Sequence, residues 1–104
     1  MYGYTMHVPA PADAYRALHR AVLDVVGDDG VEGLILHLAY ETDAGFDLTE
    51  VWESKDQLDA FNATVFPQAA ARAGVPMEGP PPETVEFEPI GVMTPRVFDS
   101  DAPA

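Results

Sequence analysis

The sequence has no cysteine, few basic residues and no long hydrophobic run. Without cysteine, the 104-residue chain can form neither a disulfide framework nor a thiolate nucleophile. No stretch reaches the roughly 20 apolar residues that a membrane-spanning helix needs. The chain begins with strand-like sequence and shows neither a basic segment nor an apolar leader. We therefore expect a cytoplasmic protein that has no membrane partner.

Basic residues are outnumbered by acidic ones. Lys and Arg number 5 against 18 Asp and Glu, which gives a formal net charge of −13. Because the backbone of a nucleic acid is itself negatively charged, this imbalance argues against nucleic-acid binding. The acids are scattered along the chain, which favours a solubilising acidic surface over an acidic binding face.

Residues for two common kinds of catalytic site are also scarce. The serines are Ser54 and Ser100, and Ser54 is placed to cap a helix, so a serine-hydrolase triad is not expected. The spacings of histidines and carboxylates match no zinc motif. The sequence therefore predicts neither a metal site nor a serine nucleophile.

The stretch from Gly45 to Gly74 organises the rest of the chain. Residues 46–53 alternate in polarity as a strand does, and an amphipathic helix follows. Ser54 and Gln57 have the spacing of a capping box at the start of that helix. Pro67 should kink or split the helix, because proline has no N–H and crowds the preceding turn.

The same periodicities predict the other elements. Strands are expected at 2–8, 33–41 and 83–93, a helix at about 13–26, and a hairpin turn at 42–45. The order β-α-β-β-α-β is that of a ferredoxin-like α+β fold, in which two helices cover one face of a four-stranded antiparallel sheet.

The domain is expected to span residues 1–93, with an arm or tail at 94–104. The second face of the predicted sheet carries Ile35, Ala39 and Val51, and these apolar side chains need a cover. We expect a second copy of the chain to supply it, so the protein is predicted to be a homodimer.

The sequence GLILHLAYETDAGFDLTEVWES, followed by KDQLDAFNATVFPQAAARAG, resembles the dimeric α/β-barrel superfamily. The resemblance extends from Tyr4 to about Met93 and includes the Trp-Glu-Ser tripeptide that ends a strand in many members. It implies two sheets packed face to face around a shared barrel. The superfamily includes cofactor-independent monooxygenases of the antibiotic-biosynthesis type, polyketide cyclases, haem-degrading enzymes and stress-responsive proteins, and fold alone does not select among them.

Trp52 and Asn62 are candidate substrate-binding residues. Related monooxygenases use a Trp and an Asn near a bound polycyclic phenol, so the resemblance implies that both line a pocket between sheet and helices. Without the resemblance, Trp52 can equally be a core residue whose indole N–H is hydrogen-bonded. Asn62 interrupts the apolar stripe of its helix, so its amide needs either structural partners or a cavity.

The candidate catalytic residues are His37 and His19. His37 lies on the second face of its predicted strand and can act as a base toward a phenol or an enol, or pair with a carboxylate in the core. Tyr15 and His19 are four residues apart on a predicted helix, so their side chains meet. The pair could orient a phenolic ligand, His19 could bind a metal or haem iron, or both could simply pack at the edge of the sheet. Glu50 shares a strand face with Trp52: if that face is buried, Glu50 is a candidate acid with a raised pKa and a candidate substrate contact, and if not, it is a surface carboxylate.

Two functions remain open from the sequence. One is an enzyme without a dedicated cofactor that acts on an aromatic or polyketide-like molecule, as a monooxygenase or a cyclase. The other is a non-catalytic homodimer, either ligand-binding or stress-associated, whose polar residues serve packing. Either could bind a small apolar or aromatic ligand.

Overall fold

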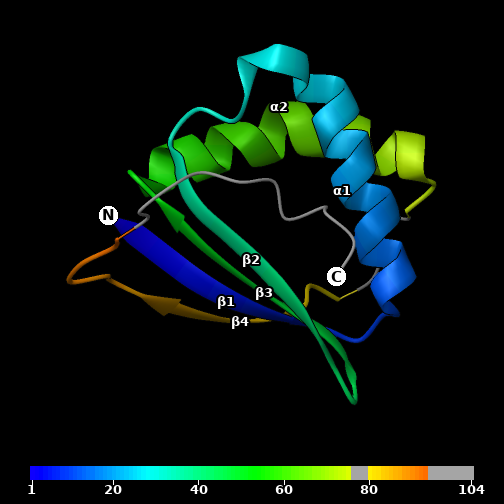
Figure 1. The fold of residues 1–104 in the computed structure, drawn as a ribbon, viewed down its shortest axis with the longest axis horizontal. Coiled ribbons are helices and arrows are strands. Elements are labelled where there is room, and N and C mark those ends of the chain that lie inside the picture. The colour runs from blue at the N-terminus through cyan, green and yellow to red at the C-terminus, as the bar shows by residue number, and fades with distance from the viewer. Residues whose placement is uncertain (76–79, 94–104) are drawn as a thin grey trace.

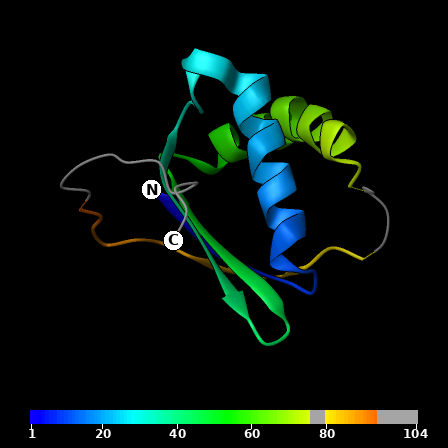
Figure 2. The same ribbon diagram turned by 45° about the vertical axis from the view of Figure 1, so that its right-hand side comes forward.

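The computed structural model describes residues 1–75 and 80–93 and confirms the predicted order of elements. These are β1 (Tyr2–Val8), α1 (Ala12–Val26), the short 3-10 helix η1 (Gly27–Asp29), β2 (Leu34–Thr42), β3 (Gly45–Trp52), α2 (Lys55–Ala73) and β4 (Glu83–Phe87). The strands form one antiparallel sheet in the order β2-β3-β1-β4. Both helices lie on the same side of it (Figures 1 and 2). The fold is thus the predicted ferredoxin-like α+β arrangement.

Helix α2 begins and ends where its sequence predicts. The backbone N–H of Gln57 donates to the side-chain oxygen of Ser54 at 3.3 Å, and Gly74 ends the helix in the left-handed conformation with φ of 70°. Of the kink or split predicted at Pro67, the split does not occur: the helix runs unbroken from Lys55 to Ala73. Beyond the proline, Ala69 and Ala70 are fully buried, and this packing keeps the last turns in place.

The core lies between the sheet and the helices. Its centre is formed by Tyr4, Trp52 and Leu58, and the Trp52 side chain is completely buried, with 0% exposed. The partly buried side chains packed against this centre are those of Tyr2, Met6, Val31, Leu34 and Phe61. Aromatic rings therefore supply much of the apolar surface that this small domain buries.

The predicted assignment of β2 side chains to the two sheet faces was wrong. The hairpin turn pairs Thr42 with Gly45, and this register sets His37 opposite Glu50 and Ala39 opposite Leu48. His37 and Ala39 therefore point toward the helices. Alternation within one strand does not reveal which of its faces joins which face of the neighbour; turn length decides that.

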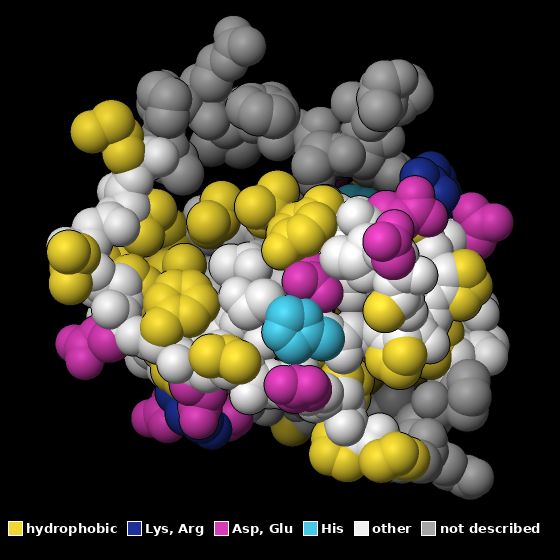
Figure 3. All heavy atoms as spheres, turned by 90° about the horizontal axis from the view of Figure 1, so that it is seen from below, with side chains coloured by type: hydrophobic (Ala, Val, Ile, Leu, Met, Phe, Trp, Pro, Cys, Tyr) yellow, Lys and Arg dark blue, Asp and Glu magenta, His cyan; other side chains and the backbone are white. Residues whose placement is uncertain are grey.

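The sheet face away from the helices is apolar nonetheless. Its hydrophobic side chains are those of Leu36, Leu38, Tyr40, Val51, Val85 and Phe87. Leu38 is 50% exposed and Val85 is 53% exposed. Figure 3, which views the molecule from below, shows hydrophobic side chains gathered over part of this side, next to acidic and histidine side chains. We call this surface the open face.

Strand β4 is shorter than predicted. It ends at Phe87, and residues 88–93 continue without strand pairing. Pro89 removes one backbone donor there, which explains the early end. The predicted arm at 94–104 lies outside the described residues. Within residues 1–75 and 80–93, no helix has both the length and the apolar composition required to cross a membrane.

Candidate functional site

Three strands and one helix bring a set of polar side chains together on the helix-facing side of the sheet. Glu50 of β3 lies opposite His37 of β2 and opposite Tyr4 of β1 in the strand register. Tyr15 of α1 reaches the same place from above the sheet. Glu50 is only 6% exposed. A carboxylate so deeply buried has to be hydrogen-bonded, because its desolvation is otherwise costly.

Both oxygens of Glu50 are engaged. Oε1 accepts hydrogen bonds from the hydroxyl of Tyr4 and from the indole Nε1–H of Trp52, the latter at 3.0 Å. Oε2 lies 2.6 Å from Nδ1 of His37. Since an ionised carboxylate only accepts, we assign the Nδ1 proton to His37. The other ring nitrogen, Nε2, is then a hydrogen-bond acceptor.

Tyr15 is the partner of that acceptor. Its hydroxyl lies 2.6 Å from Nε2 of His37 and 3.4 Å from Nδ1 of His19. The three rings stand close to parallel, with centroids 5.4 to 5.8 Å apart. Tyr15, His37 and Glu50 thus form a continuous hydrogen-bonded chain, which we call the relay. It can pass a proton from the phenol to the imidazole while the carboxylate balances the charge.

The tyrosine that supports Glu50 stays protonated. Burial, followed by the charge of Glu50, raises the pKa of Tyr4 well above its ordinary value. Its hydroxyl therefore remains a donor at every pH at which the histidines titrate. This fixes the direction of the hydrogen bond from Tyr4 to Glu50.

The structure brings most of the predicted site residues together. His37, His19, Tyr15, Glu50 and Trp52 belong to one connected group. Trp52 is wholly buried, with its N–H bound to Glu50, and does not face an open pocket. Asn62 is exposed on α2, so the expectation that its amide must face partners or a cavity was wrong.

Sequence reasoning missed Tyr4. Tyr4 falls in the strand predicted at 2–8 and Glu50 in the strand predicted at 46–53, but nothing in the sequence pairs the two residues. The signal in the sequence is weak: both strands alternate, and a tyrosine of one can lie opposite an acid of the other if the two strands are neighbours. Without the strand order, that pairing could not be chosen among the alternatives.

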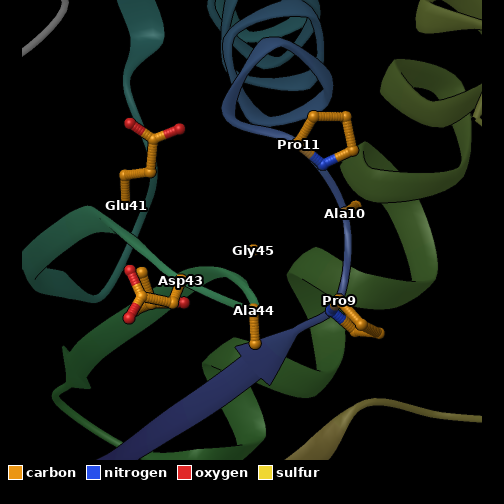
Figure 4. Close-up of a pocket in the computed structure, with 8 residues that line it drawn as sticks. Pro9, Ala10, Pro11, Glu41, Asp43, Ala44 and Gly45 are labelled. Carbon is orange, nitrogen blue, oxygen red and sulfur yellow. The ribbon is translucent and has the colours of Figure 1, made fainter.

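Two grooves lie away from the relay. One, of about 320 Å³, is bounded by Pro9, Ala10 and Pro11 on one side and by residues 41–45 of the hairpin on the other (Figure 4). A larger one, of about 540 Å³, is lined by residues 7–9 at the end of β1, by Thr42, Ala44 and Asp47 of the hairpin, and by residues 80–83. Within the described ranges 1–75 and 80–93, no group of three or more His, Asp or Glu side chains is arranged to hold a metal ion.

The larger groove includes a histidine–carboxylate pair on the open face. Nδ1 of His7 lies 2.9 Å from Oδ1 of Asp47, and the hydroxyl of Tyr40 donates to Oδ2 at 3.1 Å. The hydrogen bond to Asp47, and then its charge, raise the pKa of His7 above 6.5. His7 therefore has a carboxylate partner of its own, on the opposite face of the sheet from His37.

This pair predicts a pH-dependent contribution to stability. A histidine whose folded pKa is raised stabilises the fold below its unfolded pKa, about 6.5, and the effect disappears as the pH rises through the folded value. We expect His7→Gln to lower the melting temperature below about pH 6.5 and to match the wild type at about pH 9. Thermal unfolding followed by circular dichroism measures it. A difference that does not change with pH would contradict the assignment. Asp47→Asn removes the partner of His7 together with the acceptor of Tyr40, so it should abolish the same pH dependence.

Comparisons with known proteins place the fold. No family model matches the chain, and no curated protein matches it. Among solved structures, a candidate antibiotic biosynthesis monooxygenase from Nitrosomonas europaea is similar at 14% identity and a TM-score of 0.58, covering 88% of this chain and 100% of that one. A second, from Deinococcus radiodurans, has 17% identity and a TM-score of 0.54 over 90% of this chain and 97% of its own.

A third structure is the heme-degrader MhuD from Mycobacterium tuberculosis, solved with two hemes bound in its active site. It is 20% identical to this chain with a TM-score of 0.51, covering 90% of this chain and 100% of its own. The chain has the fold of antibiotic-biosynthesis-monooxygenase-like proteins. The resemblance read from the sequence is thereby confirmed for the fold, and at these identities it extends no further.

Proposed function

We propose that this protein is an enzyme that removes a proton from an aromatic or polyketide-like small molecule, acting as a cofactor-independent monooxygenase or as a cyclase. The observation that carries the proposal is the relay of Tyr15, His37 and Glu50, with both of its hydrogen bonds at 2.6 Å. A base of this kind suits a substrate with an acidic phenol or enol. The fold shared with candidate monooxygenases supports the same class of reaction.

The relay works as follows in this proposal. The substrate hydroxyl gives its proton to the oxygen of Tyr15 as the proton of Tyr15 passes to Nε2 of His37. Glu50 stabilises the imidazolium that forms, as a buried carboxylate does for a catalytic histidine. The side chain of His37 is 22% exposed, so the relay reaches the surface along the edge strand β2.

The substrate anion that results is electron-rich. In a monooxygenase it reduces molecular oxygen, so that one oxygen atom enters the ring and the other leaves as water. In a cyclase the anion attacks a carbonyl carbon of the same molecule and closes a ring. Both reactions draw their electrons from the substrate, so the proposal includes no cofactor.

Turnover of a panel of quinols, phenols and polyketide-like enols tests the proposal. Purified protein is incubated with each compound in air, with a metal chelator and without added flavin, and products are identified by mass spectrometry. Oxygen uptake separates the monooxygenase from the cyclase. Inertness toward the whole panel would count against an enzyme of this class.

A second candidate is a non-catalytic ligand-binding or stress-associated homodimer. It is favoured by the complete burial of Trp52 and by the internal pairing of the polar groups around it. In that case the relay serves to satisfy buried polar atoms. Replacement of His37 would then change stability and no activity.

We further propose that a second copy of the chain covers the open face. Exposed Leu38, Val85 and Phe87 lie there in neighbouring strands, and apolar patches of this kind mark interfaces. Light scattering is expected to give twice the 11.2 kDa mass of the chain. Leu38→Lys with Val85→Lys should give a monomer, whereas Leu23→Lys, a change of an exposed leucine on α1, should not. A wild-type monomer at micromolar concentration would refute this arrangement.

A further inference from the structure

Glu50 receives more hydrogen bonds than the relay itself needs. Its Oε2 contacts His37 at 2.6 Å. Its Oε1 accepts from both Tyr4 and Trp52, side chains that come from β1 and β3 and form the centre of the core. The carboxylate is therefore anchored on one oxygen and offers the other to the histidine.

The two donors have an electrostatic effect as well as a geometric one. A buried carboxylate beside an imidazole tends to draw a proton onto the pair, because the unscreened anion attracts it strongly. Hydrogen bonds donated to the charged form of the carboxylate stabilise that form and reduce its attraction for a further proton. Both donors are neutral, so they lower the proton affinity of the pair without adding charge.

We propose that Tyr4 and Trp52 are positioning residues of the relay: they hold Glu50 as an anion with Oε2 aimed at Nδ1 of His37, and so fix the tautomer whose Nε2 accepts from Tyr15. This rests on the proposed function in taking the relay to act as a base. Its consequence is that Nε2 of His37 is presented to the hydroxyl of Tyr15 as a hydrogen-bond acceptor.

The surroundings of the pair contain other titratable groups on the packed elements. Helix α1 contributes Tyr15 and His19, whose rings lie against that of His37. Strand β1 contributes Tyr4, while α2 contributes the apolar side chains of Leu58 and Phe61 near Trp52. The titration of the pair therefore has to be followed at His37 itself, where nitrogen resonances separate its ring from those of His7 and His19.

Tyr4→Phe tests the proposal because it removes one donor and keeps the ring. Loss of a hydrogen bond to a charged group should raise the apparent pKa of the His37–Glu50 pair by at least about one unit. This is at least about a tenfold increase in proton affinity. The measurement is a pH titration of the imidazole nitrogens of His37 by NMR, on the folded protein and without substrate.

Tyr2→Phe is the matched control. Tyr2 is the next residue on the same face of β1, and its hydroxyl donates to Glu86 at 2.7 Å. This change removes an equivalent hydroxyl without touching Glu50, so the titration of His37 should match the wild type. Trp52→Phe removes the second donor and should shift the pair in the same direction as Tyr4→Phe.

The outcomes separate this proposal from the proposed function. A Tyr4→Phe titration within about 0.2 unit of the wild type, with the tautomer unchanged, would overturn the positioning role. If that variant does not fold, the Trp52→Phe titration decides in the same way. A shifted titration in a protein that turns over no substrate would support the positioning role and reject the enzyme, because the NMR readout needs no activity.

Discussion

Replacing His37 with alanine is expected to lower kcat/KM toward a phenolic substrate about 100- to 10,000-fold, the usual contribution of a general base. The change removes the acceptor of the Tyr15 proton and leaves Glu50 without the group that it stabilises. Steady-state kinetics on a substrate from the panel, at several pH values, measures the loss. The pH dependence that belongs to the base should vanish together with the rate.

His7→Ala is the matched control for this prediction. His7 is also paired with a carboxylate, but it lies on the open face and contacts Asp47 in place of Glu50. Its replacement should leave kcat/KM within about twofold of the wild type. An equal loss in both variants, or no loss in His37→Ala, would remove the relay from the reaction.

Replacing Trp52 with alanine is expected to destabilise the fold by about 3 to 5 kcal/mol. The side chain is completely buried among Tyr4, Leu58 and Phe61, so the variant leaves a cavity and removes a donor from Glu50. Since small domains have total stabilities of about 5 to 15 kcal/mol, this is a large fraction of the free energy of unfolding. Denaturant unfolding followed by far-ultraviolet circular dichroism is the measurement, because the change also removes the single tryptophan fluorophore.

Trp52→Phe separates the destabilisation caused by the cavity from that caused by the lost hydrogen bond to Glu50. It keeps an aromatic ring in the core and loses the indole N–H, so it should cost clearly less than alanine. If Trp52→Ala lowered the free energy of unfolding by less than about 1 kcal/mol, Trp52 could not lie at the centre of the core as described.

The order of elements could be predicted from the sequence because each element carries its own local signal. The cap at Ser54 and the glycine at position 74 delimit α2, and alternation marks the strands. The fate of Pro67 could not be predicted, since the packing that keeps α2 continuous comes from other parts of the chain. The same holds for Asn62, whose position beside apolar residues in sequence did not decide whether it was buried.

The site could be predicted in its members but not in its connections. Tyr15 and His19 are joined by helical spacing, which the sequence contains. The bond from His37 to Glu50 depends on the register of β2 against β3, and the role of Tyr4 depends on β1 lying beside β3. Register and strand order are properties of the whole sheet and cannot be derived from residue types alone. For this reason the face predicted for His37 was wrong.

Glu50 belongs to the core and to the site at once, and this sets where new specificity can be engineered. In many enzymes the scaffold is left alone while loops are varied. Here a library that included position 50 would lose folded protein, because one carboxylate serves Trp52, Tyr4 and His37. Sequence diversity is better placed on the exposed positions of α1 near Tyr15. Substitutions there can alter the surface beside the relay without removing the hydrogen bonds that hold Glu50.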